Sequence, residues 1–429
     1  MYSLGMYLMV GFCAIMSLFN KQLRKQMHGQ AKTLFKLRKE IKKDDRVIWF
    51  HCASLGEFEQ GRLLMARVRK KRPEFKILLT FFSPSGYEVM KDFEGADVVC
   101  YLPFDTPGNA VSFLKLAHPE IGILIKYEFW ANYIYIAHHL GIKMYSVSSI
   151  FRENQYFFRW FGNVGPLKHL TWLYVQNEES KQILERHGVS NVSVVGDTRF
   201  DRVILVKMMS SNLPLVKTFC DGKKTFIIGS SWETDEEIYI PYMNKHKDWK
   251  LIIAPHKITG HHMKSIEAML EGRKVVYYSQ FSDNEINKLE GYSLDNIDEE
   301  LREADVFIID FFGKLASIYR YADIAMVGGG FFPGGVHNVP EAAVYGVPVI
   351  FGPVNEKYLE VQELKQCKGC VEVQNAEEFE SQMDHLIESV EYRQEVGAKA
   401  KEYIYSKAGA VSKCYDAIFK QQENENITR

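Results

Sequence analysis

The sequence predicts an α/β protein with two doubly wound domains, each built on a parallel sheet. Short apolar runs alternate with helix-like segments from Arg46 onward, which is the pattern of strands joined by crossover helices. The alternation is interrupted over residues 204–223 and then restarts, which indicates a second domain. The length of 429 residues allows two or three domains, each large enough to bury a core.

The overall composition is that of an ordinary globular protein, with 46% hydrophobic and 25% charged residues. The 53 Lys and Arg residues nearly balance the 54 Asp and Glu residues, which argues against a nucleic-acid partner. Seven scattered cysteines favour a reduced compartment over a disulfide framework. Cys367 and Cys370 form a single CxxC without a second pair at zinc spacing, so we expect no metal site.

Residues 1–43 are predicted to be an apolar anchor followed by a basic arm. The segment 2–19 has no charged residue, and its 18 residues are near the lower limit for a spanning helix. The segment 21–43 has nine Lys or Arg and one Glu, which places it on the cytoplasmic side and attracts it to anionic lipid. We expect membrane attachment, by a spanning or an in-plane helix. A buried helix followed by a solvated charged face is the alternative.

Residues 44–203 are predicted to form the first Rossmann-like domain, and residues 204–223 a linker, because no clear strand pattern occurs there. A helix is expected over 57–72, directly after the first strand. The expected strands are 47–53, 76–82, 121–127, 143–149 and 172–177, and the segment 193–203 closes the domain.

Residues 224–391 are predicted to form the second Rossmann-like domain. Its expected strands are 225–231, 250–256, 274–279, 306–310, 323–330 and 347–353. Helices are expected over 376–390 and 392–422, and the C-terminal segment 392–429 is predicted to pack back towards the first domain. We expect the two domains to face a cleft, with ligands at the carboxyl ends of the strands.

The turn 51–61 is the first candidate site, because it joins a strand to a helix and carries a carboxylate. Ser54 or Gly56 is expected to open the helix, with Glu57 in its first turn. Glu57 then either stabilises the helix start through the helix dipole or acts as a general base.

Two further strand ends carry groups suited to a phosphate. Gly229, Ser230 and Ser231 offer backbone N–H groups and hydroxyls before a helix, although an ordinary turn has the same sequence pattern. His256 and Lys257 follow another strand, where cations neutralise phosphate charge. The adjacent His261 and His262 point away from each other on a helix, so we expect both to face solvent.

The segment 328–353 is rich in glycine and is expected to let the backbone approach a ligand closely. It matches neither the GxGxxG motif nor the P-loop motif. Its expected ligand-binding residues are Gly334, Gly335, His337, Asn338 and Glu341, with the Glu341 carboxylate accepting hydrogen bonds from ribose hydroxyls.

The segment 125–133 places Glu128 after a strand and before two aromatic residues. Glu128 is either a helix-start residue beside core aromatics or a functional carboxylate, and its sequence position leaves both interpretations open.

Together, five segments resemble the 3-deoxy-D-manno-octulosonic acid (Kdo) transferases of lipid A biosynthesis. They are ASLGEFEQG, EFWAN, GSSWETDEE, DFFGKLASIY and HNVPEAAVYGVPVIFGP. The resemblance implies a GT-B fold and a metal-independent, inverting transfer of Kdo from CMP-Kdo to a tetraacylated lipid A precursor. It also implies the cytoplasmic face of the inner membrane and no cofactor.

The resemblance also assigns roles to residues. Glu57 matches the catalytic base and Glu128 a required carboxylate, with Ser54 and Gly56 on the acceptor side. The positions matching the CMP-side motifs are Gly229–Ser231, Pro255, His256, Gly313, Asn338 and Glu341.

Three family motifs are altered in this chain. The family's Glu-Thr-Glu-Leu-Trp-Pro-Asn corresponds to Lys-Tyr-Glu-Phe-Trp-Ala-Asn over residues 126–132, so its first acid is missing. Its Pro-Arg-His is Pro255-His256-Lys257, and the Glu of Asp-Thr-Met-Gly-Glu-Leu is Lys314. A UDP-sugar transferase of the same fold, a sugar-nucleotide epimerase and a membrane-tethered nucleotide-binding scaffold remain alternatives.

Overall fold

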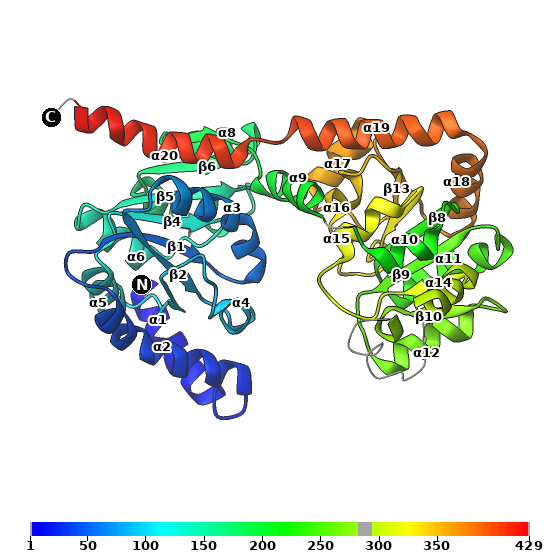
Figure 1. Ribbon diagram of the computed structural model, residues 1–429. Coiled ribbons are helices and arrows are strands. Elements are labelled where there is room, and N and C mark those ends of the chain that lie inside the picture. The colour runs from blue at the N-terminus through cyan, green and yellow to red at the C-terminus, as the bar shows by residue number, and fades with distance from the viewer. Residues whose placement is uncertain (1, 161, 211, 282–293, 428–429) are drawn as a thin grey trace. The chain divides into compact units, whose positions relative to one another are not determined.

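The computed structural model describes residues 2–160, 162–210, 212–281 and 294–427. Contacts divide the chain into two units, residues 1–202 with 407–429 and residues 203–406. Each unit is built on a parallel sheet of seven strands, in agreement with the predicted fold class (Figure 1).

The first unit has the strand order β3-β2-β1-β4-β5-β6-β7. The order reverses direction at β1, which is the switch point of a doubly wound sheet. Its strands are β1 (Arg46–Cys52), β2 (Phe75–Phe81), β3 (Val98–Tyr101), β4 (Ile121–Ile125), β5 (Lys143–Ser149), β6 (Trp172–Val175) and β7 (Val192–Val194).

Helices cover both faces of this first sheet (Figure 1). They are α1 (Tyr2–Met16), α2 (Lys21–Glu40), α3 (Leu55–Lys71), α4 (Pro84–Met90), α5 (Pro107–Ala117), α6 (Ala131–His139), α7 (Gly165–Lys168), α8 (Glu178–Arg186) and α20 (Ala410–Ile427), with the 3-10 turn η1 (Tyr156–Phe158). The helix α9 (Thr198–Met209) begins in this unit and ends in the second.

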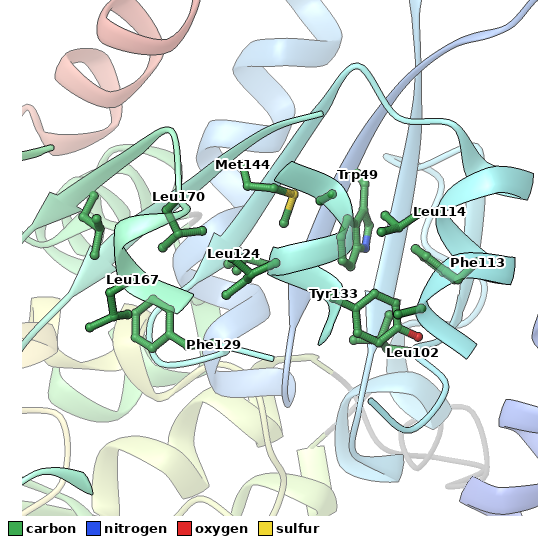
Figure 2. Packing of buried hydrophobic residues seen from close by; sticks show 14 of the residues in the cluster. Trp49, Leu102, Phe113, Leu114, Leu124, Phe129, Tyr133, Met144, Leu167 and Leu170 are labelled. Carbon is green, nitrogen blue, oxygen red and sulfur yellow. The ribbon is translucent and has the colours of Figure 1, made fainter. Parts of the chain in front are cut away.

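Alternate residues of β1 fill two separate cores. Trp49 packs with Phe113 and Tyr133, at ring-centroid distances of 5.1 and 5.8 Å, on the face covered by α5 and α6 (Figure 2). Ile48 and Phe50 face the opposite core, which also contains residues of α3 and α20. This alternation is the period-two pattern of a strand buried on both faces.

The second unit has the strand order β10-β11-β9-β8-β12-β13-β14. Its strands are β8 (Thr225–Ser231), β9 (Lys250–Pro255), β10 (Val275–Tyr277), β11 (Val306–Ile308), β12 (Ile324–Val327), β13 (Val349–Phe351) and β14 (Val371–Glu372). Its helices are α10 (Pro214–Cys220), α11 (Glu233–Lys245), α12 (Gly260–Met269), α14 (Leu294–Glu303), α15 (Leu315–Ile318), α16 (Val339–Ala343), α17 (Leu359–Gln366), α18 (Ala376–Glu388) and α19 (Val390–Ser406), with η2 (Tyr278–Phe281) and η3 (Tyr319–Tyr321).

Two details differ from the expected elements. The single helix expected over 392–422 is two helices, α19 and α20, and Gly409 between them adopts a φ of +101° that favours glycine. The interval 204–223, where a linker is expected, contains the end of α9 and all of α10.

The apolar helix α1 is tied to the first unit at its first turn. The Tyr2 hydroxyl donates to Asp105 Oδ2 at 2.7 Å, and the Ser3 hydroxyl donates to Asn132 Oδ1 at 3.0 Å. In the described part of the chain, no single helix combines the length and apolar character needed to cross a membrane. α1 is a shorter apolar helix, and only the bent pair of α9 and α10 meets the length and composition test.

The aromatic cluster around Phe58 tests the packing of the first unit. Phe58 has no exposed surface and packs against Phe81 and Phe93, at ring-centroid distances of 5.7 and 5.0 Å. We expect Phe58→Ala to lower the free energy of unfolding by about 3–5 kcal/mol, because it leaves a cavity. The control Val89→Ala, whose side chain is 59% exposed, should change it by less than about 0.5 kcal/mol in the same urea titration. Equal effects of the two substitutions would contradict this packing.

Candidate functional site

The turn after β1 holds Glu57 at the start of α3. Ser54 is the N-cap residue, and the Glu57 carboxylate accepts hydrogen bonds from the Ser54 backbone N–H, at 3.1 Å, and from the Ser54 hydroxyl. This is a capping box, so the helix-start role considered for Glu57 is present. Gly56 is exposed beside it, and a side chain there would be in ordinary contact with the Ser54 hydroxyl oxygen, at 3.8 Å. The cap fixes the direction of a half-buried carboxylate and leaves the general-base hypothesis open.

Glu128 follows β4 and is held by two side chains. Trp130 Nε1 donates to Glu128 Oε2 at 2.9 Å, and His51 Nε2 lies 3.2 Å from the same oxygen. The α6 helix starts at Ala131 with Trp130 as its N-cap residue, so Glu128 does not cap it. Of the two interpretations, the simple helix-start role is therefore wrong for Glu128.

Both carboxylates lie close to the buried Cys52 thiol. Burial raises the pKa of Cys52 well above its usual value, and the charges of Glu57 and Glu128 raise it further. Because β1 and β4 are adjacent and parallel, the residues after them reach the same edge of the sheet. The structure thus brings the two predicted carboxylates to one edge of the first unit.

Arginines also reach this edge, and sequence reasoning missed them. Burial raises the pKa of Tyr127, whereas the charges of Arg152 and Arg199 lower it and those of Asp197 and Glu57 raise it. Arg199 Nε donates to Asp197 Oδ2 at 2.7 Å. Arg199 lies just beyond β7, so the strand-end rule used for the other sites could have found it.

In the second unit, the residues of the turn between β8 and α11 are only partly accessible to a ligand. Ser230 has a left-handed φ of +58°, and its side chain is half-buried. Ser231 is fully buried, and its hydroxyl donates to Glu236 Oε1 at 2.9 Å. Gly229 lies within β8 against Tyr319. The hydroxyl expected from Ser231 is therefore used within the protein.

Aromatic and imidazole rings form a stack beside this turn. Trp232 stacks on His256 and on Phe332, at centroid distances of 4.5 and 4.2 Å, and His256 stacks on His337 at 4.4 Å. Lys257 Nζ lies 4.4 Å from the Trp232 ring centroid, and Trp232 Nε1 donates to His337 Nε2 at 3.0 Å. Three segments of the chain thus meet in one ring cluster, which sequence reasoning did not predict.

The two histidines of this stack are uncharged at neutral pH. Burial and the adjacent Lys257 lower the pKa of His256. Burial and His256 lower the pKa of His337 to about 4. The cation expected at residues 256–257 is accordingly the Lys257 ammonium, and His256 contributes a neutral ring next to Pro255 at the end of β9.

Several glycines of the segment after β12 are needed for close backbone packing, whether or not a ligand binds there. Gly330 lies against the backbone of Gly352, and Gly328 against Ser230 and Ser231, so a side chain at either position would clash. Gly335 has a φ of +87°. Lys357 donates to the carbonyl of Gly334 at 2.5 Å. Close backbone packing therefore accounts for part of the glycine content.

Asn338, Glu341 and Gly313 complete the predicted donor-side set. Asn338 Nδ2 donates to Glu341 Oε1 at 2.8 Å, while the buried Asn338 Oδ1 has no hydrogen-bond partner in the described part of the chain. Gly313 has a φ of +103° and open space around its α-carbon. An unpaired buried oxygen beside a carboxylate is a place where a ligand donor group would be stabilised.

The expectation that His261 and His262 both face solvent is wrong for His262. Its side chain is buried, with Nδ1 2.9 Å from the Lys257 carbonyl and Nε2 3.0 Å from Glu236 Oε2. Hydrogen bonds to Lys257 and Glu236 raise its pKa, although burial alone would lower it. The nearby buried carboxylate, 26 residues away in sequence, explains the difference.

The fold is a two-unit α/β fold of GT-B type. Solved structures share the fold: UDP-GlcNAc 2-epimerase from Neisseria meningitidis has a TM-score of 0.60 at 14% identity, and covers 87% of this chain and 100% of its own. MurG from Acinetobacter baumannii has a TM-score of 0.54 at 11% identity, with coverages of 87% and 99%. At these identities the likeness shows the fold alone.

Sequence comparison is more specific. Residues 25–202 match the family model of 3-deoxy-D-manno-octulosonic-acid transferase. The enzyme of this name from Aquifex aeolicus is 26% identical over 376 residues, 85% of this chain and 92% of the relative. The one from Rickettsia prowazekii is 24% identical over 377 residues, which are 84% of this chain and 76% of the relative. The chain is thus similar to Kdo transferases over most of its length.

The neutrality of His337 is testable by titration. Because its pKa is lowered to about 4, we expect its ring resonances in a proton NMR spectrum to stay constant from pH 8 to pH 5.5. The variant His337→Gln identifies these resonances by their loss. Free histidine in the same sample serves as the control, because an unperturbed imidazole titrates in that range. A midpoint near 6.5 for His337 would contradict the packing of the ring stack.

Proposed function

We propose that the protein transfers Kdo from CMP-Kdo to the tetraacyl disaccharide precursor of lipid A. The observation that carries the proposal is the pair of carboxylates, Glu57 and Glu128, at one edge of a unit that matches the Kdo transferase model. The transfer inverts the anomeric centre and uses no metal. Lipopolysaccharide core biosynthesis is the process in which this reaction takes place.

Glu57 is the general base in this mechanism. Its carboxylate removes the proton from a primary hydroxyl of the glucosamine disaccharide, and the hydroxyl oxygen then bonds to the anomeric carbon of Kdo. The bond between that carbon and the CMP phosphate breaks on the opposite face, and the electron pair leaves with CMP. The capping box supports this role, because it holds the carboxylate in one orientation at the acceptor side, next to Ser54 and Gly56.

The second unit binds CMP in this proposal. The Lys257 ammonium compensates phosphate charge, and the neutral rings of Trp232, His256 and His337 form a flat apolar wall beside it. Asn338 and Glu341 accept hydrogen bonds from ribose hydroxyls. Gly229–Ser231, Gly313, Gly334 and Gly335 provide backbone close to the nucleotide.

Donor competition tests this assignment against a UDP-sugar transferase or an epimerase. CMP should slow limited proteolysis of the purified protein, and UDP at the same concentration should not. Protection by UDP instead would exclude CMP-Kdo as the donor. Conversion of a nucleotide sugar without any acceptor would support a sugar-nucleotide epimerase. Nucleotide binding without turnover would support a membrane-tethered nucleotide-binding scaffold.

Glu57→Gln should lower the rate of Kdo transfer by about 10²–10⁴, because the amide keeps the shape of the side chain but removes the base. The measurement is the initial rate with purified protein, CMP-Kdo and the lipid acceptor. Glu88→Gln, an exposed carboxylate in the same unit, is the control and should remain close to wild type. A near-normal rate for Glu57→Gln would contradict the role of this residue.

We also propose that the first two helices hold the protein on the cytoplasmic face of the inner membrane. In α1, the side chains of Leu4, Leu8 and Phe12 are 63–69% exposed. The basic α2 follows directly, which suits an anionic lipid surface. Because the hydroxyl of Tyr2 is bonded to Asp105, the first turn of α1 stays with the first unit, which favours an in-plane helix.

Replacing Leu4, Leu8 and Phe12 with Ser should reduce binding to anionic vesicles at least about tenfold, because three large apolar side chains no longer enter the lipid. The measurement is cosedimentation at low and high salt, and salt should weaken binding of the wild type. Val89→Ser, also an exposed apolar position, is the control. Unchanged binding of the triple variant would contradict attachment through α1.

A further inference from the structure

The imidazole of His51 is fixed from one side by the neighbouring strand. His51 ends β1 with no exposed surface, and its Nδ1 lies 2.9 Å from Thr80 Oγ1 and 3.2 Å from the Thr80 carbonyl oxygen on β2. The Thr80 hydroxyl donates to the Phe50 carbonyl and accepts from Trp49 Nε1. The Thr80 carbonyl oxygen can only accept, so its contact with Nδ1 assigns a hydrogen to Nδ1.

The other ring nitrogen faces Glu128. Nε2 lies 3.2 Å from Glu128 Oε2 and 3.2 Å from Trp130 Nε1, while Trp130 Nε1 lies 2.9 Å from Glu128 Oε2. The indole has one hydrogen and is a donor only. Its shorter contact goes to the carboxylate, so it does not supply a hydrogen between Nε2 and Oε2.

The contact between Nε2 and Oε2 requires a hydrogen of its own. An imidazole with its hydrogen on Nδ1 presents only a lone pair at Nε2, and a carboxylate is an acceptor only. Two acceptors at 3.2 Å repel each other unless one of them carries a proton. The proton belongs either to an imidazolium facing a carboxylate or to a carboxylic acid facing a neutral imidazole, and both forms have zero net charge.

We propose that His51 and Glu128 form one neutral, proton-sharing pair, and that His51 is a positioning residue that holds Glu128 for Kdo transfer. The inference rests on the proposed function. Glu57 lies outside the pair, with its own hydrogen bonds to Ser54, and remains the group that takes the acceptor's proton. In the described part of the chain, no hydrogen bond uses Glu128 Oε1, so this oxygen is left to contact substrate.

Kinetics of matched variants test the pair. Glu128→Gln keeps it neutral and offers an amide hydrogen to Nε2, so kcat should fall by less than about tenfold. His51→Phe leaves the carboxylate without its partner, so kcat should fall about 100-fold while the KM for CMP-Kdo changes little. His51→Gln should recover part of kcat, because its amide donates to Glu128. His187→Phe, a histidine bonded to a backbone carbonyl in the same unit, is the control.

The double variant gives the decisive comparison. If the two residues act as one unit, His51→Phe combined with Glu128→Gln is no slower than His51→Phe alone. The proposal would be overturned if the two substitutions lowered kcat by separate factors that multiply in the double variant. It would also be overturned if Glu128→Gln had a lower kcat than His51→Phe. Circular dichroism and melting curves show whether each variant is folded.

A substrate-free measurement separates this inference from the proposed function. In the full chain labelled with 15N-histidine, ring nitrogen shifts report which nitrogen of His51 carries hydrogen, and His51→Gln assigns its signals. We expect a protonated Nδ1 in the wild type and in Glu128→Gln. A hydrogen on Nε2 alone would overturn the pair. If the wild type shows this Nδ1 state but transfers no Kdo, the proposed function fails and the pair stands.

Discussion

The parallel arrangement of the strands is the constraint on which the rest of the structure depends. Because β1 lies between β2 and β4, the ends of three strands meet at one edge. His51 and Glu128 are 77 residues apart in sequence and come within 3.2 Å. Two cores, one on each face, hold β1 in place, so the direction of its last residues is fixed before any substrate binds.

The two units use polar groups in different ways. The first unit collects carboxylates, a histidine and arginines at one edge, which suits proton transfer and charge stabilisation. In the second unit, burial keeps His256 and His337 of the ring stack neutral, and Lys257 supplies positive charge beside them. This division agrees with a reaction in which the acceptor loses a proton and a nucleotide phosphate departs.

Much of this architecture could be predicted from the sequence, because strands buried on both faces are continuous apolar runs. The four-residue β3 and two-residue β14 were missed, since such short strands have no periodic pattern. The helix-start position of Glu57 was predictable from local spacing. The burial of His262 and Ser231, which both bond to Glu236, was not, because it depends on a tertiary partner. His51 was missed for the same reason.

In the proposed reaction, this chain joins Kdo to a lipid acceptor. The most direct measurement is the mass of the lipid after incubation of the purified protein with CMP-Kdo and the tetraacyl precursor. We expect the lipid to gain the mass of one or more Kdo units, with release of CMP. A lipid of unchanged mass, under conditions in which an established Kdo transferase modifies it, would contradict Kdo transfer by this chain.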